Sequence, residues 1–401
     1  MIRKDFIISK TRNYLTKFID PIAIATDKPR QKFLRQVLGA ILLSGSLVVM
    51  EFSRLIHDDC SDIFYRLKRL LSHLQSPRAD LSKVVRAYRE QMAGYIKPDT
   101  PLIIDMTDIA KPRARRMKYL AQVRDGSENK LVNGYWCIEV YAYAKGKKVI
   151  PLSLDVFGID DPSVGSQNLQ IERNIDAVNK VFDGNGIWLA DRGFDGLNLY
   201  EMWFSRRCRF IVRQRGDRYV LTANGVRILE RDLLEHLRRQ WLHKGRHSDI
   251  VFCKVKLPDH NQHVYLIACW REKSDNPLIL LTNLVVENER LARQIISYYK
   301  KRWSCEETIQ FLKGRVGLER FRIRRYEAIK RLMILAMLAM GFLTWILLKN
   351  RQLTKYLFSL TSRFRKERKF IYYLLLDGLQ ELSRLCQLCY GELLLEPVKN
   401  G

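Results

Sequence analysis

The spacing of apolar residues divides the chain into a helical beginning and a strand-rich middle. Up to about residue 98, apolar positions recur every three or four residues, the spacing of helices that bury one face. After the linker YIKPDTP they form short continuous runs that are typical of buried strands, such as PLIIDMTDI, GIWLA, CRFIVRQR and PLILLTNL. The pattern therefore predicts a helical region followed by an α/β domain.

Further elements follow from the same pattern in the middle of the chain. Residues 135–144 and 148–157 are rich in β-forming residues and flank the turn KGKK, so they predict a hairpin. Leu169 to Phe182 keeps helical spacing, and a second helix is expected from Leu197. The order of these elements predicts a mixed sheet flanked by helices.

Residues 214–276 interrupt this order with short β-like runs, many Gly, Asp, His and Asn residues, and one helical piece near Glu230. We interpret them as a mainly β insertion. The predicted organisation is a helical N-terminal region (1–98), an α/β domain in two parts (99–213 and 277–348), the insertion (214–276) and a helical C-terminal region (349–401).

A long uncharged run, Leu332 to Leu348, reaches the lower length limit for a helix that spans a bilayer. A buried core helix has the same composition. Because the run is single and follows a charged helix, we expect it to be buried in protein and expect no membrane partner. The apolar run at the N-terminus is too short for a secretory signal, so a cytoplasmic location is expected.

The charge of the chain indicates its class of partner. Its 401 residues include 70 Lys and Arg against 43 Asp and Glu, a net charge of +27, and 47% hydrophobic residues. A folded protein with this excess of positive charge is expected to bind a polyanion, either a nucleic acid or an anionic membrane surface. The basic residues recur along the whole chain, which favours an extended polymer.

Two N-terminal helices could provide one such contact. Ser46 and Ser61 are placed to cap helices on either side of the turn HDDC, an arrangement that resembles a helix-turn-helix. Arg66 and Arg69 would then lie on the second helix and bind DNA. Ordinary bundle packing explains the same pair of helices.

Three carboxylates lie at positions that suggest a role as metal ligands. Asp105 lies inside a predicted buried strand, and Asp191 ends another, just before Arg192 and Gly193. Asp191 is also a possible helix N-cap. Asp108 is a rival to Asp105, but we prefer Asp105 because Asp108 more easily reaches solvent or a nearby Arg.

The third carboxylate, Glu306, belongs to the stretch YKKRWSCEETIQFLK. Tyr299, Arg302, Glu306 and Lys313 fall within roughly 60° of one face at about 100° per residue, if the stretch forms one continuous helix. Two Asp on adjacent strands and a Glu on a packed helix can hold two divalent ions. Oxygen ligands favour Mg²⁺ or Mn²⁺, so phosphodiester chemistry on a nucleic acid is the predicted reaction.

This stretch resembles the signature of bacterial insertion-sequence DDE transposases, in which Tyr, Arg, Glu and Lys recur at the spacing found here. The D-x-T at Asp105 and the DRG at Asp191 resemble the first two catalytic boxes of that family. The resemblance covers about residues 99–348. It implies a ribonuclease-H-like catalytic domain, with Asp105, Asp191 and Glu306 as ligands of two metal ions.

The resemblance also implies a function. It implies cut-and-paste transposition within the bacterial nucleoid, in which the phosphodiester at the transposon end is hydrolysed. The freed 3′-hydroxyl would then attack the other strand to form a hairpin or attack target DNA in strand transfer. Tyr299, Arg302 and Lys313 would contact the DNA end, to which we add Arg192. The partners would be terminal inverted repeats, target DNA and a second copy of the chain on DNA.

An aromatic residue in an insertion of this kind can stack on a flipped base, and Trp241 and Trp270 are the candidates, although Trp residues are more often core. Three other functions stay open. They are a catalytically silent DNA-binding regulator of transposition, a structure-selective nuclease and a membrane-associated basic protein.

Overall fold

The computed structural model describes residues 4–56, 62–77, 80–125, 130–245, 249–258, 260, 262–271, 274–361 and 370–390. The chain divides into two compact units, and strand β1 (Pro101–Ala110) contributes to both. The first unit comprises Met1–Tyr95, Met106–Val181 and Glu306–Gly401, and the second comprises Ile96–Asp105 and Phe182–Cys305.

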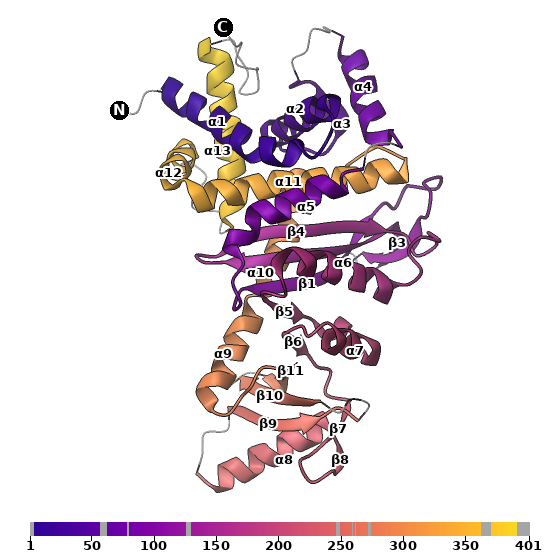
Figure 1. Cartoon of the computed structure of the whole chain (residues 1–401), viewed down its shortest axis with the longest axis vertical. Coiled ribbons are helices and arrows are strands. Elements are labelled where there is room, and N and C mark those ends of the chain that lie inside the picture. Colours follow the sequence, from indigo (N-terminus) through magenta and orange to yellow (C-terminus); the bar gives the residue numbers. More distant parts are fainter. Residues whose placement is uncertain are drawn as a thin grey trace. The chain divides into compact units, whose positions relative to one another are not determined.

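Helices make up most of the first unit (Figure 1). They are α1 (Lys4–Ala23), α2 (Lys28–Ser44), α3 (Val49–Ser53), α4 (Ile63–Gln75), α5 (Ser82–Met92), η1 (Ala93–Tyr95), α6 (Gln167–Phe182), η3 (Phe311–Val316), α11 (Tyr326–Lys349), α12 (Arg351–Leu360) and α13 (Ile371–Tyr390). Its strands are the end of β1 with β2 (Ala121–Asp125), β3 (Lys130–Ala144) and β4 (Lys148–Phe157). The predicted hairpin is confirmed, because β3 and β4 pair antiparallel from Ala144 and Lys148 onwards.

Helix α11 contains the uncharged run and packs alongside β4 (Figure 1). It is long and apolar enough to cross a membrane, but 83% of its most apolar window is buried inside the protein. A Cβ at Gly341 would lie 2.5 Å from the hydroxyl of Tyr88, so the glycine permits close packing of α5 on this helix. The expected burial of the run is therefore confirmed.

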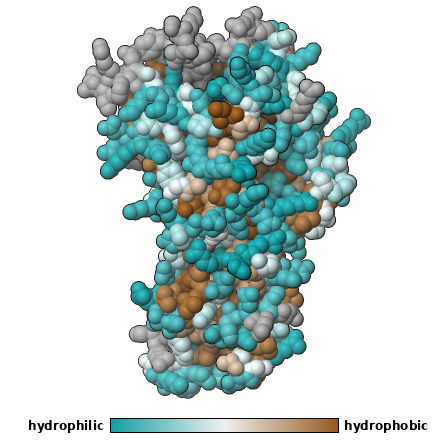
Figure 2. All heavy atoms as spheres, viewed as in Figure 1, coloured by the Kyte–Doolittle hydropathy of each residue, from teal (hydrophilic) through white to brown (hydrophobic). Residues whose placement is uncertain are grey.

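Hydrophilic residues cover most of the face in Figure 2, and apolar residues lie there in separate patches.

Strand β4 pairs with β3, and side chains from neighbouring helices bond to its backbone. These bonds run from Tyr88 to the Pro151 carbonyl (2.8 Å), from Arg89 to the Leu152 carbonyl (2.9 Å), from Thr344 to the Val149 carbonyl (2.6 Å) and from the Val149 amide to the Tyr372 hydroxyl (2.7 Å). Backbone groups that no second strand pairs are thus satisfied by the helices.

The N-terminal helices differ from the prediction. Helix α3 has five residues and begins after Val48, whose amide is bonded by Ser46, so Ser46 does not cap the predicted longer helix. Ser61 and the turn HDDC lie outside the described residues. Asp62 caps α4 by accepting from the Phe64 amide.

The second unit carries the rest of the sheet in the order β1-β5-β6-β11-β10-β9-β7-β8. Its strands are β5 (Ile187–Ala190), β6 (Phe210–Arg213), β7 (Tyr219–Leu221), β8 (Arg227–Leu229), β9 (Ile250–Lys256), β10 (His263–Arg271) and β11 (Ser274–Thr282). Its helices are η2 (Arg192–Phe194), α7 (Leu197–Ser205), α8 (Glu230–His243), α9 (Glu289–Lys300) and the start of α10 (Trp303–Gln310).

Pairing within this sheet is both parallel and antiparallel. Strands β1, β5 and β6 are parallel, whereas β11 pairs antiparallel with β6 and β10. Strands β7 to β10 and helix α8 come from residues 214–276, so the insertion lengthens the sheet. The predicted fold class, a ribonuclease-H-like mixed α/β sheet with an insertion, is confirmed.

Candidate active site

Asp105 and Asp191 occupy neighbouring positions on two parallel strands. Ile104 of β1 is the register partner of Ala190, the last residue of β5, and one of these two aspartates follows each of them directly in the chain. Both side chains are half-buried. Ligand sites in open α/β sheets form at the carboxyl ends of parallel strands, which is the direction in which β5 ends at Asp191. The sheet therefore brings together two of the three predicted carboxylates.

Neighbouring donors hold the carboxylate of Asp191. The hydroxyl of Tyr299 donates to Asp191 Oδ1 at 3.2 Å, and Arg213 Nη1 lies 3.8 Å from the same oxygen. Burial, together with the negative charge of Asp191, raises the pKa of Tyr299 well above its ordinary value, so the phenol keeps its proton and remains a donor. Asp191 stands at the N-cap position of η2 but makes no capping bond with its side chain.

Asp105 has a closer cationic partner. Arg302 Nη1 donates to Asp105 Oδ2 at 2.7 Å, and the Arg302 residue is 8% exposed. The thiol of Cys305 lies 3.9 Å from the same oxygen. A buried guanidinium needs such a partner, so this ion pair fixes both side chains.

The signature residues do not lie on one continuous α-helix, so that prediction is wrong. Helix α9 ends at Lys300, and the amides of residues 301, 302, 304 and 305 bond to carbonyls three residues earlier. Helix α10 starts at Trp303, and from Phe311 the chain forms a wider π-helix, η3. Tight turns and π-turns change the angle per residue, so a face calculated at a constant α-helical step does not apply.

Lys313 lies on η3 and pairs with carboxylates of the first unit. Its Nζ is 3.1 Å from Asp108 Oδ1 and 3.0 Å from Glu319 Oε1. Burial opposes the charge of Lys313, but Glu319 and Asp108 raise its pKa above the ordinary value. Asp108 is 7% exposed, so the expectation that it reaches solvent is wrong. The ion pair with Lys313 makes its burial possible.

Glu306 is the half-buried third carboxylate, and it follows Cys305 directly in the first turn of α10. An acidic side chain is favoured there by the positive end of the helix dipole. Trp303, at the start of the same helix, is 61% exposed. An exposed Trp is unusual, and the sequence gives no sign of this one because most Trp side chains are largely buried.

Arginines surround a cavity of about 760 Å³ beside Asp191. Besides Arg192, which was predicted, the cavity is lined by Arg213, Arg215 and Arg231. Sequence reasoning missed these three, although the RQR that ends β6 was a usable signal. Four guanidinium groups next to a carboxylate are suited to a phosphate-bearing strand.

The remaining predicted contacts have partners within their own unit. Trp241 packs edge-on against Phe252 with ring centroids 5.4 Å apart, and Arg238 lies 4.5 Å over the Trp270 ring. Arg66 donates to the Ile56 carbonyl, and Arg69 donates to Gln36 Oε1 at 3.2 Å. These contacts stabilise the fold, and a role on DNA stays a prediction for all four residues.

Comparison with known proteins identifies the family. The model of the transposase DDE domain matches residues 97–342, more than half of the chain. The chain is a DDE transposase. No curated protein sequence matches it. Among solved structures, the chain is similar to the piggyBac transposase in a synaptic complex with hairpin DNA, at 10% identity and a TM-score of 0.49, over 96% of this chain and 81% of the other.

DDE transposases as a family act with divalent metal ions, and the residues of this transposase fit such ions. Asp105 and Asp191 offer hard carboxylate oxygens from adjacent strands, and fixed donors orient both groups. Mg²⁺ and Mn²⁺ prefer ligands of this kind.

Proposed function

We propose that this transposase excises and inserts DNA by cut-and-paste transposition. It would hydrolyse the phosphodiester at each transposon end and join the freed 3′-hydroxyl to target DNA. The observation that carries the proposal is the register of β1 and β5, because it sets Asp105, midway along β1, beside Asp191, which directly follows β5. Glu306 completes the proposed set of ligands.

The proposed cofactor is a pair of Mg²⁺ or Mn²⁺ ions held by Asp105, Asp191 and Glu306, which would activate the attacking oxygen and stabilise the leaving oxygen. The chain itself supplies orientation. Tyr299 keeps one oxygen of Asp191 in place through its hydrogen bond, and Arg302 offsets the charge of Asp105. Arg302 also offers donors to the phosphate of the strand that is cut.

We propose that the arginine-lined cavity beside Asp191 binds the DNA backbone. Arg192, Arg213, Arg215 and Arg231 line this cavity and would bind phosphates next to the cleaved bond. Lys313 stays a separate proposed contact with the DNA end. Trp303 joins Trp241 and Trp270 as a candidate to stack on an unpaired base, and its exposure favours it over the other two. Arg66 and Arg69 remain candidates for contacts with the terminal inverted repeats.

Cutting and joining two ends also requires that the ends be brought together. We therefore propose that two copies of the chain assemble on the terminal inverted repeats and then bind target DNA. The proposed setting is the bacterial nucleoid.

The decisive experiment incubates the protein with Mg²⁺ and its own flanking DNA, and then maps the 3′-ends and the joined products. Asp191→Asn and Glu306→Gln should each lower cleavage on the order of 10³-fold, because each removes a metal ligand. Both variants should still bind DNA. Glu307→Gln, the same change one residue further along α10, should cleave like the wild type.

Other outcomes separate the alternatives. Persistent cleavage by clean Glu306→Gln protein would exclude the assigned site. A wild-type protein that binds ends without cutting them in Mg²⁺ or Mn²⁺ would be a silent regulator, and cleavage without joined products would indicate a nuclease.

Comparing Asp105→Asn with Asp108→Asn tests which of the two residues is the metal ligand. Asp105→Asn should lose cleavage. Asp108→Asn should mainly lose stability, since it breaks a buried ion pair.

A further inference from the structure

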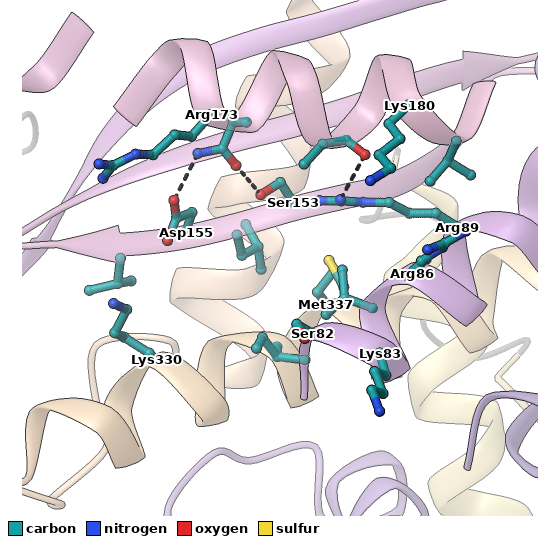
Figure 3. Close-up of a pocket in the computed structure, with 17 residues that line it drawn as sticks. Ser82, Lys83, Arg86, Arg89, Ser153, Asp155, Arg173, Lys180, Lys330 and Met337 are labelled. Carbon is teal, nitrogen blue, oxygen red and sulfur yellow. Dashed lines mark hydrogen bonds between the residues drawn. The ribbon is translucent and has the colours of Figure 1, made fainter. Parts of the chain in front are cut away.

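A second basic cavity lies wholly within the first unit and includes none of the residues assigned to catalysis. Its volume is about 480 Å³, within the range of small-molecule sites. Helices α5, α6 and α11 and strand β4 form its walls (Figure 3). The proposed cleavage reaction makes no use of this cavity.

The charges around this cavity are strongly unbalanced. Six cationic side chains line it: Lys83, Arg86, Arg89, Arg173, Lys180 and Lys330. Among the described residues that line it, the acidic one is Asp155. Neighbours restrain some of the cations, since Arg86 pairs with Glu90 at 2.9 Å and Arg173 donates to the Ser163 carbonyl at 2.7 Å. The excess of positive charge nevertheless predicts an anionic ligand.

Arg89 is the buried member of this set. It is 8% exposed, and it donates from α5 to the carbonyl of Leu152 on β4 at 2.9 Å. It also donates to the carbonyl of Ala177 on α6 at 3.1 Å (Figure 3). Burial lowers the pKa of Arg89 to about 10, so the guanidinium stays charged at neutral pH. Its two bonds use Nε and Nη1, and the cavity that it lines is where its other donors can meet a ligand.

Part of the cavity is apolar, and its two ends carry different charged residues. Its apolar lining includes Val85, Val156, Ile334 and Met337. Figure 3 shows Asp155 at the end near Arg173 and Lys330, whereas Lys180, Arg86 and Lys83 lie at the other end. Asp155 accepts from Gln170 (2.5 Å) and Asn174 (2.7 Å), so its orientation is fixed. A carboxylate repels phosphate but accepts hydrogen bonds from hydroxyl and amino groups.

We propose that this cavity binds a nucleoside phosphate. The base and sugar lie against the aliphatic side chains, with their hydroxyl and amino groups towards Asp155. The phosphate lies at the end of the cavity that is lined by Lys83, Arg86 and Lys180. The guanidinium of Arg89, which also lines the cavity, adds positive charge. The ligand is either a free nucleotide or one nucleotide turned out from bound DNA, since both present the same groups.

The test uses AMP as the probe for the full-length protein, with inorganic phosphate and adenosine as comparisons, by isothermal titration calorimetry. AMP should bind saturably and at least about tenfold more tightly than either fragment, because each fragment forgoes one set of contacts. Photo-crosslinking with 8-azido-AMP should label peptides of α5 or α6. Absence of saturable AMP binding would overturn the proposal.

Two variants examine the two halves of the site, and the circular dichroism of each should match the wild type. Lys83→Glu combined with Lys180→Glu reverses charge at the phosphate end, and Ala177→Phe places a ring in the cavity without changing charge. Each should weaken AMP binding at least about tenfold, as loss of a charged contact or steric filling requires. Lys28→Glu combined with Lys355→Glu, at exposed positions on α2 and α12, is the charge-matched control and should bind AMP normally. Unchanged AMP binding in both test proteins would overturn the proposal.

A final comparison separates the two sources of the ligand. If a single-stranded oligonucleotide displaces AMP and Ala177→Phe weakens DNA binding, the natural ligand is a nucleotide of DNA. If DNA leaves AMP in place, the ligand is a free nucleotide. Both results support the site and concern residues outside the catalytic set, so they are independent of whether the protein cleaves DNA.

Discussion

Two residues of the signature, Tyr299 and Arg302, already contact the carboxylates that the proposed metal ions require. Tyr299 donates to Asp191, and Arg302 pairs with Asp105. These two residues therefore orient the proposed metal ligands Asp191 and Asp105, in addition to the DNA contacts proposed for them. Lys313 acts differently, because its partners, Asp108 and Glu319, belong to the first unit.

Tyr299→Phe tests the positioning role of the phenol. The change removes a hydroxyl that bonds to Asp191 and keeps the ring, so cleavage should fall about tenfold, equivalent to about 1.4 kcal/mol. The Mg²⁺ concentration needed for half-maximal cleavage should rise as well, which a purely structural role would not cause. Tyr298→Phe, one residue earlier on α9, is the matched control, and an equal effect there would contradict the prediction.

Trp303→Ala should weaken DNA binding while leaving the stability of the protein nearly unchanged. The side chain is 61% exposed, so its loss should change the free energy of unfolding by less than about 1 kcal/mol. If Trp303 stacks on a base, affinity for single-stranded ends should fall by about 1–3 kcal/mol, measured by fluorescence anisotropy. Equal DNA affinity for wild type and variant would show that Trp303 does not stack on a base, and Trp241 and Trp270 would remain the candidates.

At the scale of elements, the segment from α9 to η3 shows where reasoning from a constant helical step failed. The strands and the hairpin were predictable because their apolar runs are continuous and end at clear turns. The break after Lys300 and the π-turns from Phe311 carry no Pro, and Gly314 lies inside the π-segment. In this segment Arg302 pairs with Asp105 and Lys313 pairs with Asp108, and local sequence does not reveal these distant partners.

Helix α8 begins with a buried acid that should make stability depend on pH. Glu230 is 0% exposed, and both its carboxylate oxygens are without a hydrogen-bond partner among the described residues. Burial, with a contribution from Asp195, raises its pKa to about 8. The folded protein therefore keeps a proton that the unfolded chain loses near pH 4.5, so stability should fall as pH rises between these values.

The expected loss from this group between pH 5 and 8 is at most about 4 kcal/mol, at about 1.4 kcal/mol per pH unit. Glu230→Gln should flatten the dependence, because an amide does not titrate. Glu235→Gln, at an exposed position on the same helix, should leave it unchanged. Thermal denaturation across this pH range measures all three proteins, and parallel curves for wild type and Glu230→Gln would refute the assignment.

At the scale of the whole molecule, the charge of +27 should dominate the response of DNA binding to salt. Neutralising several phosphates releases their counterions, so affinity should fall about 10³-fold or more between 50 and 200 mM salt. Asp191→Asn is suitable for this measurement because it should bind DNA without cutting it. An affinity that barely changes over this range would show that the positive charge lies away from the DNA.

The family, the fold class and the adjacency of Asp105 and Asp191 could all be predicted from sequence. They depend on short motifs and on the expectation that the two Asp lie on adjacent strands. The register that sets Asp105, midway along β1, beside the end of β5 comes from the structure. The arginines beside Asp191 could not be ranked in advance, because 70 Lys and Arg residues offer no local mark of which ones gather. Their selection follows from the way β6, β11 and α8 surround one cavity.

The bonds along β4 protect the chain against self-association. An unpaired strand edge can accept a strand from another molecule, which is how ordered aggregates begin. An added strand would need the free backbone groups of β4, and several of these already bond to the side chains of Tyr88, Arg89, Thr344 and Tyr372. Since these side chains come from α5, α11 and α13, the backbone of β4 is covered by bonds from three separate helices.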